Sequence, residues 1–172
     1  MNMSDNIEIM WEGRFITAKR EGKWEYVSRS RGIKAAVILA IDDGHVLLVE
    51  QFRVPLGKNC IELPAGLVGD HAENGDEDSV IAAIRELEEE TGYRAEIMTD
   101  LGEFYSSPGM VSESFSLFRA EGLTKTGEGG GVDGENITVH RVALSALSEF
   151  IDSKRKQGAG IDVKLMMFLK LD

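Results

Sequence analysis

The sequence has a single cysteine among its 172 residues, which excludes an internal disulfide and fits a reducing compartment. That residue, Cys60, lies in the apolar context NCIELPAG, which favours a buried thiol over a nucleophile. No segment approaches the roughly 20 consecutive apolar residues of a membrane span. Residues 1–15 also lack the basic and apolar regions of a signal peptide. We therefore expect a soluble, cytoplasmic protein.

Basic side chains are scarce relative to acidic ones. The chain has 19 lysines and arginines against 30 aspartates and glutamates, a formal net charge of −11. Nucleic acids and anionic membranes are bound by clustered lysines and arginines, so neither is an expected partner. A polyanionic substrate would be repelled unless metal ions or local arginines reversed the field. His45, His71 and His140 lie far apart in the sequence, which argues against a zinc site.

The hydrophobic patterns predict a mixed α/β (α+β) protein. Residues 7–28 alternate apolar and polar side chains, which is typical of an antiparallel hairpin or meander. Further strands are predicted at residues 35–42, 45–53, 60–66, 94–105, 113–123 and 137–144. Helices are predicted at residues 78–91, 145–158 (capped by Ser145 or Ser148) and 162–171, and a mobile glycine-rich loop at 124–136. We expect N-terminal strands in residues 1–30 and one domain in residues 31–172.

The segment VIAAIRELEEETGY (80–93) places four glutamates within five positions. Like charges at helical spacing repel by roughly 0.2–0.5 kcal/mol per pair, and a solvated helix face would be the simplest explanation. On a helical wheel, however, an apolar stripe of Val80, Ile84 and Leu87 lies opposite the acidic side. That acidic side carries Glu86, Glu89, Glu90, Ala82 and Ala83.

Carboxylates at positions i, i+3 and i+4 form a set of hard oxygen ligands, which Mg²⁺ or Mn²⁺ prefers. The small alanines beside them leave room for an approaching group. Bound cations would also remove the repulsion among Glu86, Glu89 and Glu90. Arg85 lies four residues before Glu89 and can pair with it, orienting that ligand. The helix therefore predicts a divalent metal site.

The stretch GDEDSVIAAIRELEEETGY resembles the signature of the Nudix hydrolases: Glu, seven residues, Arg-Glu-apolar-x-Glu-Glu-x-Gly-apolar. The matching positions are Glu77, Arg85, Glu86, Leu87, Glu89, Glu90, Gly92 and Tyr93. His71 stands where the family has its opening glycine, and Gly66 lies farther upstream, so the loop 67–76 carries an insertion. Insertions in surface loops are well tolerated, and this one leaves the helix ligands in place.

The segments RGIKAAVILA, VEQFRVP, ELPAGL and YSSPGMVSESFSLF are similar to the ADP-ribose pyrophosphatase and nucleoside-diphosphate-sugar hydrolase branch of that family. The resemblance implies a Nudix fold, with a mixed sheet between helices, and cleavage of X-linked nucleoside diphosphates. It implies metal binding by Glu86, Glu90, often Glu89, and the carbonyl of Ala65. Members of this branch are commonly homodimers whose N-terminal strands reach across the interface.

Diphosphate hydrolysis needs carboxylates for Mg²⁺ (or Mn²⁺), a base for the attacking water and cations for the diphosphate. The resemblance implies a catalytic glutamate in the glycine-rich loop, where Glu135 is the candidate and Asp133 the alternative. A solvated loop acid is the other interpretation. Arg53 is the candidate diphosphate donor because its guanidinium offers a bidentate fork, although a surface arginine at a strand end would look the same.

Three further residues are candidate substrate contacts. Glu62 resembles a metal-assisting or substrate-binding residue, with a structural role as the alternative. Glu113 is a candidate for binding the sugar or a phosphate-bridging metal. Trp24 or Phe52 could stack on a base, which contributes roughly 1–3 kcal/mol, unless these rings lie in the core.

Strands with several aromatic residues are prone to aggregation at a sheet edge, and Trp11, Phe15, Trp24 and Tyr26 lie in residues 7–28. Burial against a partner would remove that hazard, so we expect a two-fold homodimer whose N-terminal strands help to build the active site. The predicted activity is hydrolysis of ADP-ribose or another nucleoside diphosphate sugar to a nucleoside monophosphate and a sugar phosphate. The alternatives are a dinucleotide substrate or a non-catalytic nucleotide-sugar sensor. The sequence leaves the base and the sugar open.

Overall fold

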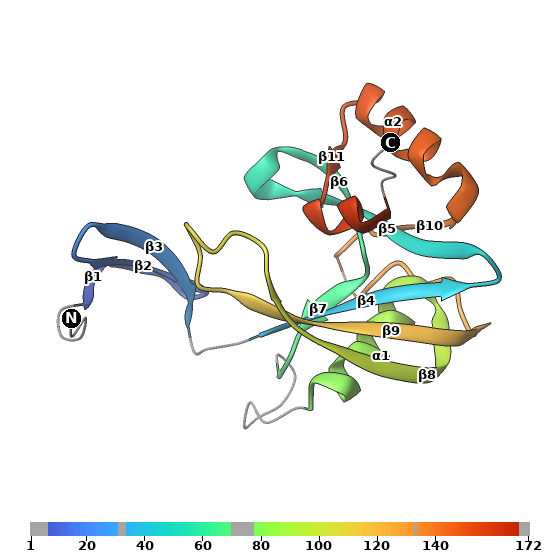
Figure 1. The fold of residues 1–172 in the computed structure, drawn as a ribbon, viewed down its shortest axis with the longest axis horizontal. Helices are drawn as coiled ribbons and strands as arrows, with labels where there is room; N and C mark the ends of the chain where they lie inside the picture. The colour runs from blue at the N-terminus through green and yellow to red at the C-terminus, as the bar shows by residue number, and fades with distance from the viewer. Residues whose placement is uncertain (1–6, 31–33, 70–77, 133, 169–172) are drawn as a thin grey trace.

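The computed structural model describes residues 7–30, 34–69, 78–132 and 134–168. Three short strands, β1 (Ile7–Glu12), β2 (Ile16–Glu21) and β3 (Trp24–Arg29), form an antiparallel sheet of their own. This sheet projects from one end of the molecule (Figure 1). The antiparallel strands predicted for residues 7–28 are confirmed.

The second sheet has eight strands in the order β11-β6-β5-β4-β9-β8, with β10 paired to β5 and β7 paired to β4. Its strands are β4 (Ala35–Asp42), β5 (His45–Arg53), β6 (Lys58–Glu62), β7 (Ala65–Leu67), β8 (Tyr93–Tyr105), β9 (Ser114–Lys125), β10 (Thr138–Ala143) and β11 (Gly160–Ile161). The pairs β4–β9 and β6–β11 are parallel and the others antiparallel. The sheet is therefore mixed, as predicted.

The helices are α1 (Ser79–Thr91) and α2 (Leu147–Lys156), with short 3-10 helices η2 (Val54–Leu56), η3 (Leu144–Ala146) and η4 (Val163–Phe168). Within the described ranges, none of them is long and apolar enough to cross a membrane. Strand β4 is buried on both faces, which explains its continuous apolar run. Its Ile38 packs in one core with Leu87 of α1, and Val37 packs in another with Ile151 of α2. The two helices thus cover opposite faces of the sheet.

Helix α1 begins and ends where the sequence predicts. The side chain of Asp78 accepts a hydrogen bond from the Val80 amide, and Gly92 ends the helix in the left-handed region at φ 71°. The predicted apolar stripe is confirmed for Leu87, which is fully buried, and for Val80, which packs against the same core. It was wrong for Ile84, which is 38% exposed, whereas Ala82 and Ala83 are fully buried. Small side chains let the helix lie close to the sheet, so the alanine side makes the core contact and turns the neighbouring carboxylates inward.

The C-terminal predictions need two corrections. Neither Ser145 nor Ser148 caps α2, which follows the turn η3 directly, with Ala146 at its N-cap and no side-chain cap hydrogen bond. Ser145 lies inside η3, and Ser148 inside the first turn of the helix. In the described part of the predicted helix at 162–171 the structure has the 3-10 helix η4, in which Leu165 is buried and Phe168 packs against the same core. Residues 169–171 lie outside the described residues.

The small sheet is tied to the larger one by the loop between β8 and β9. The Val27 amide donates to the Met110 carbonyl and the Ser112 amide to the Val27 carbonyl, both over 2.9 Å.

Cys60 is buried, as expected, and this burial raises the pKa of its thiol to about 11. At neutral pH Cys60 is therefore an uncharged thiol and a poor nucleophile.

Candidate active site

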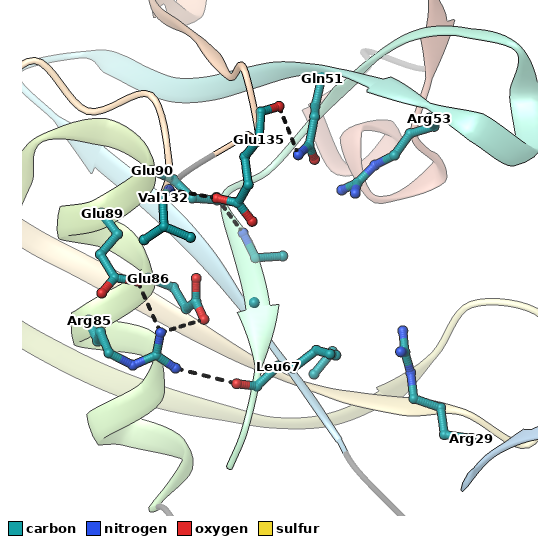
Figure 2. A pocket seen from close by; sticks show the side chains of 13 residues that line it. Arg29, Gln51, Arg53, Leu67, Arg85, Glu86, Glu89, Glu90, Val132 and Glu135 are labelled. Atoms are coloured by element: carbon teal, nitrogen blue, oxygen red, sulfur yellow. Dashed lines mark hydrogen bonds and ion pairs between the residues drawn. The ribbon is translucent and has the colours of Figure 1, made fainter. Parts of the chain in front are cut away.

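A pocket of about 430 Å³ lies between α1, β7 and the end of β5. In Figure 2 the acidic side chains of α1 lie on one side of β7, and Arg53 and Arg29 on the other. The lining residues are Arg29, Ala35, Gln51, Arg53, Ala65, Gly66, Leu67, Arg85, Glu86, Glu89, Glu90, Val132 and Glu135. Acidic and basic groups thus face the same space from opposite walls.

Glu90 is the most buried acid of the pocket, with 5% of its surface exposed. Its Oε2 accepts a hydrogen bond from the Ala65 amide over 2.9 Å. Burial raises the pKa of Glu90 to about 8, and the nearby charges of Glu86 and Glu135 add to this effect. A carboxylate here is therefore unfavourable unless a cation compensates it.

Glu86 lies directly over the backbone of β7. A Cβ atom added to Gly66 would stand 1.8 Å from the Glu86 carboxyl carbon, so a larger residue would force the Glu86 carboxylate to move from this position. Burial also raises the pKa of Glu86. The glycine of ELPAGL thus contributes to the site by forming the floor under a carboxylate.

Arg85 holds two of the acidic side chains. Its Nη1 lies 2.8 Å from Glu86 Oε1 and 3.0 Å from Glu89 Oε2, and its Nη2 donates to the Leu67 carbonyl over 3.4 Å. The pairing of Arg85 with Glu89 that the sequence suggested is therefore present. Arg85 also links α1 to β7, so it sets the position of the helix against the pocket floor.

The donor set suits a hard divalent cation by its chemistry. Three carboxylates, Glu86, Glu89 and Glu90, face one pocket beside the backbone of Ala65. In the described part of the chain they do not form a ready-made cage of three or more ligating side chains, since Glu86 and Glu89 engage Arg85. A cation would nevertheless offset the burial and like charge that raise the pKa of Glu90. The residues therefore fit a hard divalent cation.

Arg53 reaches the pocket from the end of β5 and is held from behind by Glu62. Its Nε and Nη2 donate to the two Glu62 carboxylate oxygens over 2.7 and 2.8 Å. Glu62 is 8% exposed and is not among the lining residues. This bidentate pair fixes the plane of the guanidinium. The structure thus places Glu62 as the partner of Arg53.

Sequence reasoning missed Arg29. The last residue of β3 lines the pocket and pairs through its Nε with Glu113, which is not itself a lining residue. Arg29 is the last residue of a strand, and no motif in the sequence marks it as a pocket residue. Gln51 and Val132 were also missed, because a strand glutamine and a loop valine carry no motif.

Glu135 is brought to the acidic wall by the segment after β9. Its Oε2 accepts a hydrogen bond from the Val132 amide over 2.9 Å, and its carbonyl accepts one from Gln51 Nε2 over 3.3 Å. Glu135 and Glu90 line the same pocket, and the charge of Glu135 adds to the raised pKa of Glu90. The alternative, Asp133, lies outside the described residues, as do His71 and Glu77.

The candidate stacking residues lie outside this pocket. Trp24 is 60% exposed on β3 and Phe52 is 56% exposed on β5, so neither lies in the core. No aromatic side chain lines the pocket within the described ranges. The base of a nucleotide would therefore need a surface beyond this pocket.

Comparison with known proteins agrees with this geometry. A sequence model of the NUDIX domain matches residues 31–162. The chain is 38% identical over 120 residues to an ADP-ribose pyrophosphatase of Bacillus subtilis, covering 69% of this chain and 62% of that protein. It is 36% identical over 180 residues to a GDP-mannose pyrophosphatase of Cronobacter sakazakii, covering 98% and 89%.

A solved structure of an ADP compounds hydrolase has the same fold, with a TM-score of 0.65 and 22% identity over 86% of this chain and 80% of that one. The chain belongs to the NUDIX family. The predictions of a Nudix fold and of a Nudix hydrolase are thereby confirmed.

Proposed function

We propose that the protein is a Mg²⁺-dependent hydrolase that cleaves the diphosphate of ADP-ribose or another nucleoside diphosphate sugar, with Mn²⁺ as an alternative metal. The observation that carries the proposal is one pocket with a wall of carboxylates on α1, two arginines opposite and Glu135 between them. The named activities of the Bacillus subtilis and Cronobacter sakazakii relatives support this substrate class. The products are a nucleoside monophosphate and a sugar phosphate.

Each wall of the pocket has a separate task. Glu86, Glu89 and Glu90, with the Ala65 carbonyl, would hold the metal, which would supply positive charge against the phosphoryl oxygens and make a water molecule more acidic. Arg53 binds and orients the diphosphate, while Glu62 keeps its guanidinium in place.

The remaining tasks belong to the β3 end and the loop after β9. Arg29, held by Glu113, is a second cation for the diphosphate. Glu135 accepts a proton from the attacking water.

We propose in addition that the protein is a two-fold homodimer joined through the β1–β3 sheet. The support is that this sheet exposes large apolar side chains: Ile7, Ile9, Trp11, Phe15 and Trp24 are each more than half exposed. Such a surface is an aggregation hazard unless a partner covers it. A partner's sheet could also supply the aromatic ring that the pocket lacks, with Trp24 as the candidate.

The test is a screen of nucleoside diphosphate sugars, ADP-ribose and dinucleotides with Mg²⁺ and with Mn²⁺, in which a phosphatase releases phosphate from the products. We expect turnover of a nucleoside diphosphate sugar or ADP-ribose, and its loss on chelation of the metal. Preference for a dinucleotide, or binding of nucleotide sugars without any turnover, would overturn the proposal in favour of one of the two alternatives.

The matched pair of variants is Glu90→Gln and Glu149→Gln. The Glu90 site already favours a neutral side chain, and glutamine still offers an oxygen to the Ala65 amide, so the fold should persist. We expect kcat to fall by about 10²–10³-fold or more, because a metal charge that acts in the transition state is lost. Glu149, exposed on α2, is the control and should leave turnover unchanged.

A further inference from the structure

The segment 126–131 is bonded to the C-terminal end of α1. Helix ends leave their last carbonyl groups without partners inside the helix, and here a distant part of the chain supplies the donors. The bonds run from Gly131 N to Glu89 O (3.0 Å), from Gly130 N to Glu90 O (2.8 Å), and from Thr126 N and Gly127 N to Gly92 O (2.7 and 3.0 Å). Two of the three accepting residues are metal-ligand candidates.

The contact is so close that it requires glycine on both sides. A Cβ atom on Gly129 would stand 2.4 Å from the Thr91 carbonyl carbon and 2.5 Å from the Glu90 oxygen. A Cβ atom on Gly92 would stand 2.3 Å from the Gly127 oxygen. Because all these neighbours are backbone atoms, an added side chain could be accommodated only if the segment moved away from the helix.

The same segment determines where Glu135 lies. The Ile137 amide donates to the Gly130 carbonyl over 3.2 Å, so the chain folds back at Glu135. A Cβ atom on Gly131 would stand 2.2 Å from Glu135 Oε2, which shows that the carboxylate lies against this glycine. On the far side, Gln51 of β5 donates to the Glu135 carbonyl (Figure 2). Glu135 is therefore held between the end of α1 and β5.

We propose that Gly129 is a positioning residue, because the glycine contact between segment 126–131 and α1 sets the distance from Glu135 to the metal-binding carboxylates. The backbone that carries Glu89 and Glu90 accepts the hydrogen bonds, so the segment leading to the proton acceptor is bonded directly to the residues that carry the metal ligands. This inference rests on the proposed function, in which Glu135 takes the proton from water. On this inference the glycines allow the loop backbone to lie against the end of α1, which a residue with a side chain could not do without moving the loop.

The test compares Gly129→Ala with Gly158→Ala. Both glycines have positive φ, 67° and 92°, but Gly158 has no atom within 4 Å of an added Cβ, so it controls for backbone strain alone. We expect Gly129→Ala to lower kcat at least tenfold with KM changed less than threefold, and Gly158→Ala to leave both unchanged. A wild-type kcat for a folded Gly129→Ala would overturn the inference.

A double variant shows whether Gly129 acts through Glu135. In the Glu135→Gln background the alanine should cause little further loss of kcat, because the group that it misplaces has already been removed. Losses that multiply would show that Gly129 acts independently of Glu135 and would overturn the inference.

Hydrogen exchange tests the contact apart from catalysis. The Gly130 and Gly131 amides should be protected in the wild-type protein and should exchange faster in Gly129→Ala; rapid exchange in the wild type would refute the contact. Protected amides together with full activity of Glu135→Gln would instead reject the proposed role of Glu135 and leave the contact intact. The two measurements therefore distinguish a wrong contact from a wrong catalytic role.

A milder variant serves if Gly129→Ala does not fold. Thr126 Oγ1 lies 3.2 Å from Gly92 O and 3.1 Å from Glu88 Oε1. Thr126→Val removes these hydrogen bonds without adding bulk against the helix. We expect a several-fold loss of kcat and faster exchange of the Gly130 amide; no change in either measurement would overturn the inference.

Discussion

Acidification should weaken a partly buried polar cluster that joins β5 to its neighbours. Glu50 Oε2 accepts hydrogen bonds from Lys154 Nζ of α2 over 2.6 Å and from His140 Nε2 of β10 over 2.9 Å. Its Oε1 accepts one from Asn59 of β6 over 3.1 Å. Burial alone would raise the pKa of Glu50, but these donors outweigh it and lower the pKa from 4.5 to about 2.

The direction and size of the effect follow from that pKa. Because the folded-state pKa lies below the unfolded value, the stabilisation is complete above about pH 5 and is lost as the pH falls toward 2. With pKa values of 4.5 and about 2, the loss between pH 7 and pH 3 is about 2 kcal/mol. Other acids also titrate in this range, so the comparison requires a variant that lacks only this carboxylate.

The assay is urea unfolding of the wild type and Glu50→Gln at several pH values from 7 to 3. At pH 7 the variant should be clearly less stable, because the Lys154 ammonium, whose side chain is 16% exposed, loses its charged partner. The difference should shrink by about 2 kcal/mol at pH 3, where the wild-type carboxylate is losing its advantage. Glu149→Gln is the exposed control. A difference between wild type and Glu50→Gln that stays constant from pH 7 to pH 3 would refute the reasoning.

Three further outcomes are expected. Glu135→Gln should lower kcat with little effect on KM if the residue acts as a base, whereas a raised KM with unchanged kcat would indicate a binding role. Glu62→Gln should raise KM by roughly 10–100-fold, since loss of a charge-assisted pair costs about 1.5–3 kcal/mol and frees the Arg53 fork; an unchanged KM would count against this. Deleting residues 1–28 should give a monomer with weakened substrate binding, and light scattering that shows a fully active intact monomer would contradict the dimer.

The sequence by itself determined the helix α1 and the chemistry that it carries. Asp78 and Gly92 act on backbone groups within a few residues of themselves, and the spacing of Glu86, Glu89 and Glu90 follows from the helical repeat. The strands β4 and β5 were equally readable, because a short turn at residues 42–44 joins two apolar runs. Such features depend on neighbours along the chain, so they require no knowledge of the fold.

The tertiary structure alone decided which side of α1 is buried and which residues meet the carboxylates. Ala82 and Ala83 are buried and Ile84 is not, because small side chains allow α1 to lie close to the sheet. How closely β4 lies beneath the helix cannot be derived from the sequence of the helix. Arg29 and Glu113 form a pair across 84 positions of sequence, as do Gln51 and Glu135. Contacts between residues so far apart in the sequence depend on how whole elements pack. A periodic pattern of apolar residues indicates only that a side chain is buried, and not which distant group lies beside it.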